Sequence, residues 1–168
     1  MASNRPRILI IGPRGVFGYE GGIEKFTDEF LPRTLKHADA TILCVHPYAG
    51  ETLDGLDFVH VKKSKLLKTD KALYILYALY LQMFRSYDHI YIFGTNFSVL
   101  VLLLRLVFWR NNKIHLRSGS VDHKLDKWSP MMQSFMRFTE KFCRLADTVI
   151  AVAPNIQKHL DTLGITCL

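Results

Sequence analysis

The sequence contains little cysteine: Cys44, Cys143 and Cys167 are the three in 168 residues. An odd count without a C-x-x-C pair gives no indication of a disulfide framework or a zinc site. Cys44 lies in an apolar run, which favours a small core residue. These features predict a protein of a reducing, cytoplasmic compartment.

The sequence also lacks a long uncharged apolar run. The first seven residues, "MASNRPR", contain no apolar signal region. The most apolar later stretch, 97–109, is too short to span a bilayer and contains Arg105. We therefore expect a buried or interfacial helix there, and leave open a peripheral position on the inner face of a membrane.

Apolar residues are abundant, at 49% of the chain. Basic residues outnumber acidic ones, which gives a formal net charge of +7. The length suits one compact domain. A basic surface favours anionic partners such as phosphates or acidic lipid head groups, although a merely soluble basic protein fits the same numbers. Nucleic acid is not expected as a partner, because no recognised binding motif is present.

Short apolar runs alternate with helical patterns along the chain. The runs, rich in Val and Ile, read as strands buried on both faces; they cover 7–12, 40–45, 57–61, 89–94, 113–117 and 148–152. Helices are expected at 23–35, at 71–85, from an Asn96 cap to 109, from Ser129-Pro130 to Leu145, and from Pro154 to Gly164. This alternation predicts an α/β fold, a Rossmann-like parallel sheet with helices on both faces.

Five glycines lie between Gly12 and Gly22, after the first predicted strand and before the first predicted helix. In parallel α/β sheets, ligands bind beyond the carboxyl ends of the strands, where helix N-termini favour anions. Gly21 and Gly22 place no side chain in the way. The loop therefore predicts a phosphate, or a sugar that carries one, although a merely structural tight turn fits the same residues.

A dinucleotide site is the rival interpretation. It needs G-x-G-x-x-G and an acid about 20 residues further on. Here Gly12, Gly15 and Gly18 give G-x-x-G-x-x-G, and the second strand ends in "CVHP" without an acid. A nicotinamide or flavin site is therefore not expected.

Two segments resemble the N-terminal domain of the GT-B-fold glycosyltransferases of family-4 (group 1) type, especially the rhamnosyltransferase-like branch. The first is "RILIIGPRGVFGYEGGIEKFTDEFLPRTL" (7–35), with G-x-R-G-hydrophobic and Y-x-G-G-hydrophobic-E. The second is "DHKLDKWSPMMQSFMRFTEKFCRLADTVIAVAPNIQKHL" (122–160), with K-x-x-K-W and A-D-x-V-I-A. Together they extend over nearly the whole chain.

The resemblance implies that residues 1–168 form the acceptor-side half of a transferase, with the C-terminal donor domain absent. It implies a nucleotide-diphosphate sugar and a glycan or polyprenyl-linked acceptor, with no cofactor and no metal. The candidate donor-phosphate and substrate-binding residues are Arg14, Gly21, Gly22, Glu24, Asn96, Arg117 and Ser118. Many relatives carry a histidine or an acid just after the strand that matches 113–117, but here Ser118, Gly119 and Ser120 occupy those positions. The nearest polar candidates for a catalytic role are therefore Asp122 and His123.

The segment 61–85 places a run of lysines before a helix rich in leucine and tyrosine. Basic residues beside aromatic ones suit an anionic membrane surface. A solvated lysine loop followed by a core helix is the other interpretation.

We therefore expect a glycosyltransferase domain of polysaccharide or glycolipid assembly, with little activity as this fragment alone. The alternative is a non-catalytic α/β module that binds a phosphorylated ligand or a protein partner. The donor sugar, the acceptor and the linkage are not readable from these residues.

Overall fold

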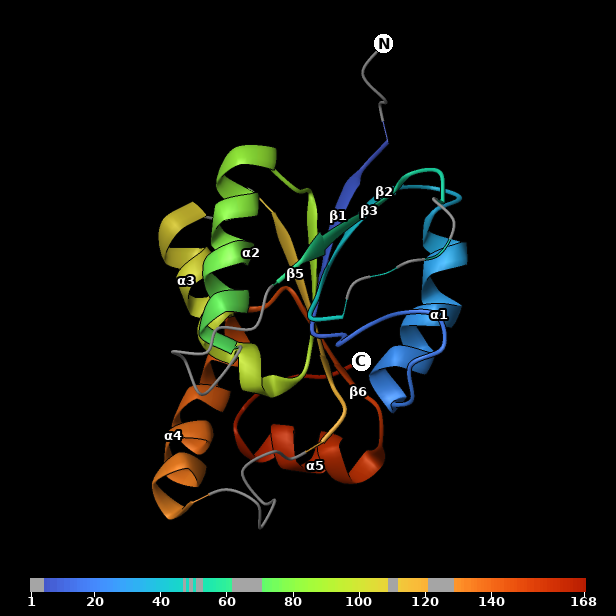
Figure 1. Ribbon diagram of the computed structural model, residues 1–168. Coiled ribbons are helices and arrows are strands. Elements are labelled where there is room, and N and C mark those ends of the chain that lie inside the picture. Colours follow the sequence, from blue (N-terminus) through green and yellow to red (C-terminus); the bar gives the residue numbers. More distant parts are fainter. Residues whose placement is uncertain are drawn as a thin grey trace. The chain divides into compact units, whose positions relative to one another are not determined.

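The structure is a computed structural model that describes residues 5–46, 48, 50, 53–61, 71–108, 112–120 and 129–168. Six strands form a sheet in the order β3-β2-β1-β4-β5-β6 (Figure 1). The strands are β1 (Arg7–Ile11), β2 (Asp39–Cys44), β3 (Leu56–His60), β4 (His89–Phe93), β5 (Lys113–Ser118) and β6 (Thr148–Ala151). A helix follows each strand except β2, which leads to β3 without a helix among the described residues. The predicted Rossmann-like α/β class is confirmed.

The chain divides into two compact units, residues 1–91 and 92–168, and each is described by itself. The N-terminal unit contains β1 to β3 with α1 (Gly22–Thr34) and α2 (Lys71–Arg85). Its strands are parallel, with Ile10 opposite Ile42 and Ile42 opposite Phe58. The first two of these side chains are fully buried. They form the centre of this unit's core.

The strand β3 differs from the prediction that all strands are buried on both faces. None of its residues, Leu56 to His60, is fully buried. The reason is its place at the edge of the sheet, where it pairs with β2 alone. The predicted helix at 71–85, by contrast, is confirmed with both ends as expected.

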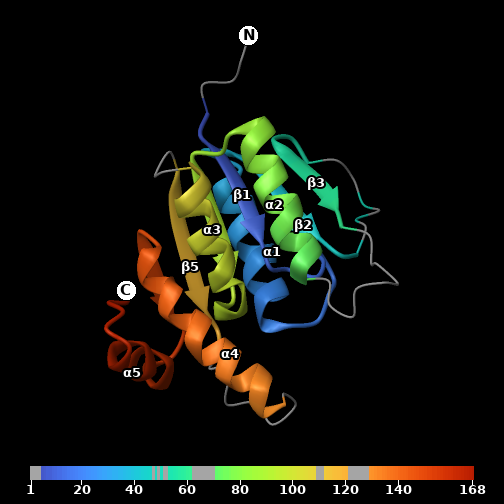
Figure 2. The ribbon, with the colours of Figure 1, turned by 90° about the vertical axis from the view of Figure 1, so that its left-hand side faces the viewer.

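The C-terminal unit contains β5 and β6, which run parallel with Leu116 opposite Val149. Its helices are α3 (Ser98–Phe108), α4 (Pro130–Glu140) and α5 (Pro154–Thr162), with short 3-10 helices η1 (Thr95–Phe97) and η3 (Lys141–Leu145). The Ser129 hydroxyl accepts a hydrogen bond from the N–H of Met132, which confirms the predicted cap of α4. Figure 2 shows α4 and α5, in orange and red, after β5 in the chain.

Two predicted helix boundaries in this unit are wrong. Asn96 does not cap α3; it lies inside η1, whose cap is Gly94. The α-helix that begins at Pro130 ends at Glu140, and residues up to Leu145 continue as η3. The tighter 3-10 turn lets the chain enter β6 within three residues, because the N–H of Asp147 already pairs with Ile114 O at 2.9 Å.

The three cysteines are free, and Cys44 and Cys143 are buried. Burial raises the pKa of the Cys44 thiol to about 11, and that of Cys143 to about 12. Thiols with such values carry almost no thiolate at neutral pH. Cys44 is therefore a small core residue, as its apolar surroundings in the sequence indicate.

The Asp147 of the A-D-x-V-I-A segment has a structural role. Its carboxylate accepts a 2.7 Å hydrogen bond from the N–H of Ile114 at the start of β5 and pairs with the Arg105 guanidinium of α3. Arg105 also donates to the carbonyls of Leu145 and Asn112, each at 3.0 Å. One aspartate and one arginine thus join α3, β5 and the entry to β6.

Asp147→Asn is expected to lower the free energy of unfolding at about pH 7 by about 1 kcal/mol. Burial raises the pKa of the Asp147 carboxyl, but the Ile114 N–H and Arg105 outweigh it, so the net pKa lies below its ordinary value. A carboxyl whose folded pKa is depressed stabilises above its unfolded pKa, and this stability is lost as the pH falls through the folded pKa.

Urea unfolding of the wild type and of Asp147→Asn should therefore diverge near neutral pH and converge in acid. Asp161→Asn on α5 is the control, because Asp161 is exposed and forms no ion pair with another described residue. A constant difference between wild type and Asp147→Asn at every pH would contradict the assignment.

Candidate functional site

The glycine-rich segment connects β1 to α1 at the carboxyl end of β1. Its first part, Pro13 to Val16, is largely buried, whereas Gly18 to Gly22 lie at the surface. Tyr19 folds back over Gly15, where a Cβ would lie 2.5 Å from the Tyr19 ring, and stacks on His46. Gly15 therefore makes room for an aromatic ring, and the half of the loop that remains accessible to a ligand is the exposed one.

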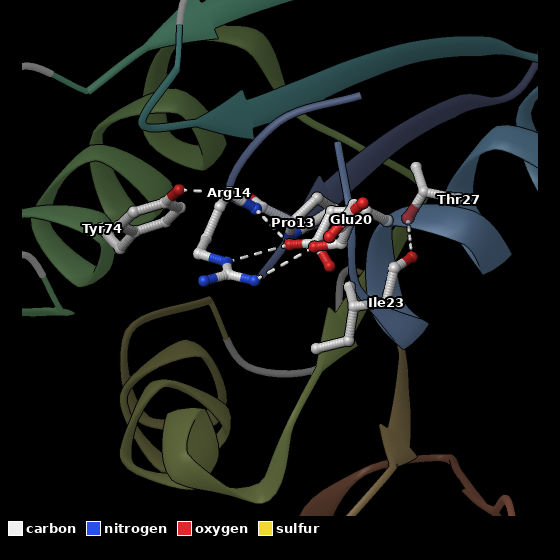
Figure 3. A network of polar contacts seen from close by, with 7 residues as sticks. Pro13, Arg14, Glu20, Ile23, Thr27 and Tyr74 are labelled. Carbon is white, nitrogen blue, oxygen red and sulfur yellow. Dashed lines mark hydrogen bonds and ion pairs between the residues drawn. The ribbon is translucent and has the colours of Figure 1, made fainter. Parts of the chain in front are cut away.

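The contact between Arg14 and Glu24 closes the loop. A carboxylate oxygen of Glu24 accepts hydrogen bonds from the backbone N–H and from Nε of Arg14, each at 3.2 Å (Figure 3). The Glu24 side chain is 4% exposed and that of Arg14 is 68% exposed. The guanidinium therefore turns Nε to the buried carboxylate and donates from Nη2 to the carbonyl of Glu20 at 3.4 Å, while the side chain as a whole stays largely exposed.

Three further contacts fix the loop backbone. The carboxylate of Asp28, one turn after Glu24, accepts a 2.7 Å hydrogen bond from the N–H of Phe17, whose φ is 53°. The hydroxyl of Tyr74, on α2, donates to the carbonyl of Pro13 at 3.1 Å. The carbonyl of Arg14 accepts from the N–H groups of Val45 and His46, after β2. The loop is thus tied to α1, to α2 and to the end of β2.

The start of α1 is open. No side chain caps it, so the N–H groups of Gly22, Ile23 and Glu24 have no partner within the helix. A Cβ on Gly22 would meet nothing within 4 Å. A Cβ on Gly21, at φ 151°, would lie 2.0 Å from a Glu24 carboxylate oxygen. The two adjacent glycines therefore serve different needs: Gly21 leaves room for Glu24, and Gly22 leaves the helix end accessible.

This arrangement can bind an anion. Unpaired N–H groups at a helix N-terminus and an exposed guanidinium both favour phosphate. Glu24 lies in the first turn of α1, so its carboxylate offsets part of the positive charge of both Arg14 and the helix terminus, and the helix end retains its exposed N–H donors. Glu24 itself contacts the loop, so its predicted place in the site is structural in this geometry.

The remaining substrate-binding candidates lie in the C-terminal unit. Asn96 follows β4, and its side-chain oxygen is buried without a hydrogen bond among the described residues. Arg117 and Ser118 end β5; the carbonyl of Arg117 accepts from the N–H of Gly94 at 2.9 Å. Burial lowers the pKa of the Arg117 guanidinium from its ordinary value. The structure thus brings these three residues to two neighbouring strand ends within this unit.

The predicted catalytic residues, Asp122 and His123, lie outside the described residues. The lysines of 62–70 also lie outside them. No helix in the described part of the chain is both long and apolar enough to cross a membrane.

Sequence reasoning missed Asp28 and Tyr74. For Asp28 a signal exists, since it lies four residues after Glu24 and so on the same face of the helix. For Tyr74 there is none, because only the packing of α2 brings it to Pro13, 61 residues away in sequence.

No known family and no curated protein matches this chain. Solved structures do match. Sucrose-phosphate synthase from Thermosynechococcus elongatus has a TM-score of 0.71 at 15% identity, over 96% of this chain and 46% of that one. The lipopolysaccharide outer core galactosyltransferase WaaB has a TM-score of 0.62 at 16% identity, over 95% and 43%.

A third match is a protein from Listeria monocytogenes to which a UDP-N-acetylglucosamine 2-epimerase activity has been ascribed. Its TM-score is 0.57 at 11% identity, over 95% of this chain and 42% of that one. The chain therefore has the fold of one half of a GT-B protein and spans less than half the length of these three structures. At such identities the likeness shows the fold alone, and the family-4 and rhamnosyltransferase-like assignments stay predictions.

Gly21→Ala and Gly22→Ala form a matched pair that tests the geometry of the loop. Gly21→Ala should destabilise the protein by about 1–2 kcal/mol, because its Cβ collides with Glu24 at a φ that alanine rarely adopts. Gly22→Ala should change stability by less than about 0.5 kcal/mol, since its Cβ enters open space. Urea unfolding measures both, and equal losses would contradict the assigned difference.

Proposed function

We propose that this chain is the acceptor-side domain of a glycosyltransferase that uses a nucleotide-diphosphate sugar. The observation that carries the proposal is the exposed start of α1, with its unpaired N–H groups beside the Arg14 guanidinium. The GT-B-type fold supports it, because two of the matched structures bear names of enzymes that make glycosidic or sugar-phosphate products. A second domain would complete the binding site for the donor.

In this proposal, the departing nucleoside diphosphate places its phosphate oxygens at the N–H groups of Gly22 and Ile23. Negative charge builds up on the leaving phosphate during sugar transfer, so fixed donors aimed at it lower the barrier. Arg14 contributes a second, charge-assisted contact, and Glu24 holds its guanidinium in place. Glu24 is thus a positioning residue.

The acceptor in this proposal is a glycan or polyprenyl-linked lipid, and the protein works at the inner face of a membrane. Asp122 and His123 remain the proposed catalytic groups, because they are the nearest polar candidates to the positions after 113–117 where many relatives carry a histidine or an acid and this chain carries Ser118, Gly119 and Ser120. Asn96, Arg117 and Ser118 are proposed to contact the substrate from the ends of β4 and β5. That no cofactor or metal takes part stays a prediction.

Gly22→Val tests the phosphate site. A branched side chain in the open space at the helix end should raise the donor KM about tenfold or more, because it keeps the phosphate from the N–H groups. Arg14→Ala should raise it by about 10- to 100-fold, the cost of a charged hydrogen bond. The measurement is nucleoside-diphosphate release by the full-length protein in a screen of nucleotide-sugar donors.

Arg33→Ala is the matched control, because Arg33 is an exposed arginine in the last turn of the same helix. It should leave the donor KM unchanged. A Gly22→Val protein with wild-type kinetics would refute the phosphate site. Vigorous turnover by residues 1–168 alone would refute the need for a second domain, and a full-length protein without turnover on any donor would favour the non-catalytic module.

A further inference from the structure

Helix α4 presents an apolar face to solvent. Met131, Phe135 and Phe138 are between 55% and 80% exposed, and their spacing of four and three residues aligns them on one side of the helix. Met132 is also exposed. Leu106 and Val107, near the end of α3, are exposed as well, and α3 packs against α4. Scattered exposed apolar residues are ordinary, but a contiguous set marks an interaction surface.

The exposed charges of α4 and η3 have one sign. Arg137, Lys141 and Arg144 are exposed and recur with the same four-and-three spacing along α4 and η3. Glu140 is the only acid between residues 129 and 145, and it is buried, 3.0 Å from the imidazole of His159. Every exposed charged side chain of this segment is therefore cationic.

We propose that α4 and η3 form a docking surface for an anionic lipid membrane. Aromatic and methionine side chains would enter the boundary between head groups and acyl chains, and the arginine and lysine heads would meet lipid phosphates. Each basic residue near such a surface contributes about 1 kcal/mol, less at high salt. The inference deepens the proposed function, since it rests on a membrane-linked acceptor.

Charge argues against a second copy of the chain as the occupant. A two-fold contact through this face would bring Arg137, Lys141 and Arg144 close to their own copies, and like charges repel. A lipid surface supplies the opposite charge instead.

Helix α2 is the competing surface, because it also exposes a stripe of apolar side chains: Leu76, Tyr77, Tyr80, Met83 and Phe84. The cation whose side chain is described on α2 is Arg85, and it pairs with Asp57 of β3. We assign the membrane to α4 because three exposed cations, Arg137, Lys141 and Arg144, lie on α4 and η3, and the vesicle assay below compares the two helices directly.

Vesicle co-sedimentation of the full chain compares the two helices with matched variants. Phe135→Ser/Phe138→Ser removes two exposed aromatic residues from α4, and Tyr80→Ser/Phe84→Ser removes two of similar exposure from α2. The vesicles contain phosphatidylcholine with about 30% phosphatidylglycerol, or phosphatidylcholine alone. Circular dichroism and thermal unfolding check that each variant is folded.

The wild type should bind the anionic vesicles and lose affinity as salt increases. The α4 variant should bind at least about tenfold more weakly. Arg137→Gln/Lys141→Gln should also weaken binding and should flatten the salt dependence. The α2 variant should bind like the wild type.

Four results would overturn the assignment. The first is that the wild type does not bind anionic vesicles, and the second is that the α4 variant binds them like the wild type. The third is that the α2 variant loses as much affinity as the α4 variant. The fourth is that the wild type self-associates and the α4 variant does not. Nucleoside-diphosphate release with a water-soluble acceptor is measured in parallel. Vesicle binding without turnover would count against the proposed transferase alone, and turnover without vesicle binding would count against the α4 surface alone.

Discussion

The contact of the Glu24 carboxylate with Arg14 determines the form of the glycine-rich loop. A buried carboxylate needs hydrogen-bond donors, and here the backbone N–H and Nε of Arg14 supply them. The contact joins the beginning of the loop to the first turn of α1, and Asp28 repeats the arrangement one turn later through the N–H of Phe17. Side chains of α1 thus stabilise the conformation of the loop, and residues 18–22 keep this conformation at the surface.

A second carboxylate, that of the partly exposed Asp147, organises the C-terminal unit in a similar way. Asp147 accepts from the N–H of Ile114 and pairs with Arg105, which also donates to two carbonyls. In both units, an acid and an arginine satisfy backbone groups next to a strand: after the end of β1 in the first unit, and at the starts of β5 and β6 in the second. Glu24 and Asp147, one acid from each of the two recognisable sequence segments, therefore stabilise the architecture of their own units.

The regular elements could be predicted from the sequence because their signals are local. Apolar runs predicted all six strands, although not their order in the sheet, and the periodicity of 71–85 predicted α2 with both ends. The errors arise where tertiary contacts decide. Asn96 has the chemistry of a cap but lies within η1, and α4 ends early because the chain must reach β6. The exposed start of α1 was foreseen from Gly21 and Gly22, whereas the anchor from Tyr74 depends on how α2 packs.

The most direct test of the account is a crystal structure of the full-length protein with a bound nucleoside diphosphate. The account predicts phosphate oxygens within about 3.2 Å of the backbone nitrogens of Gly22 and Ile23. It also predicts that the Glu24 carboxylate stays on Arg14, whose outer edge contacts the phosphate. A diphosphate bound elsewhere, with the start of α1 still exposed to water, would contradict it.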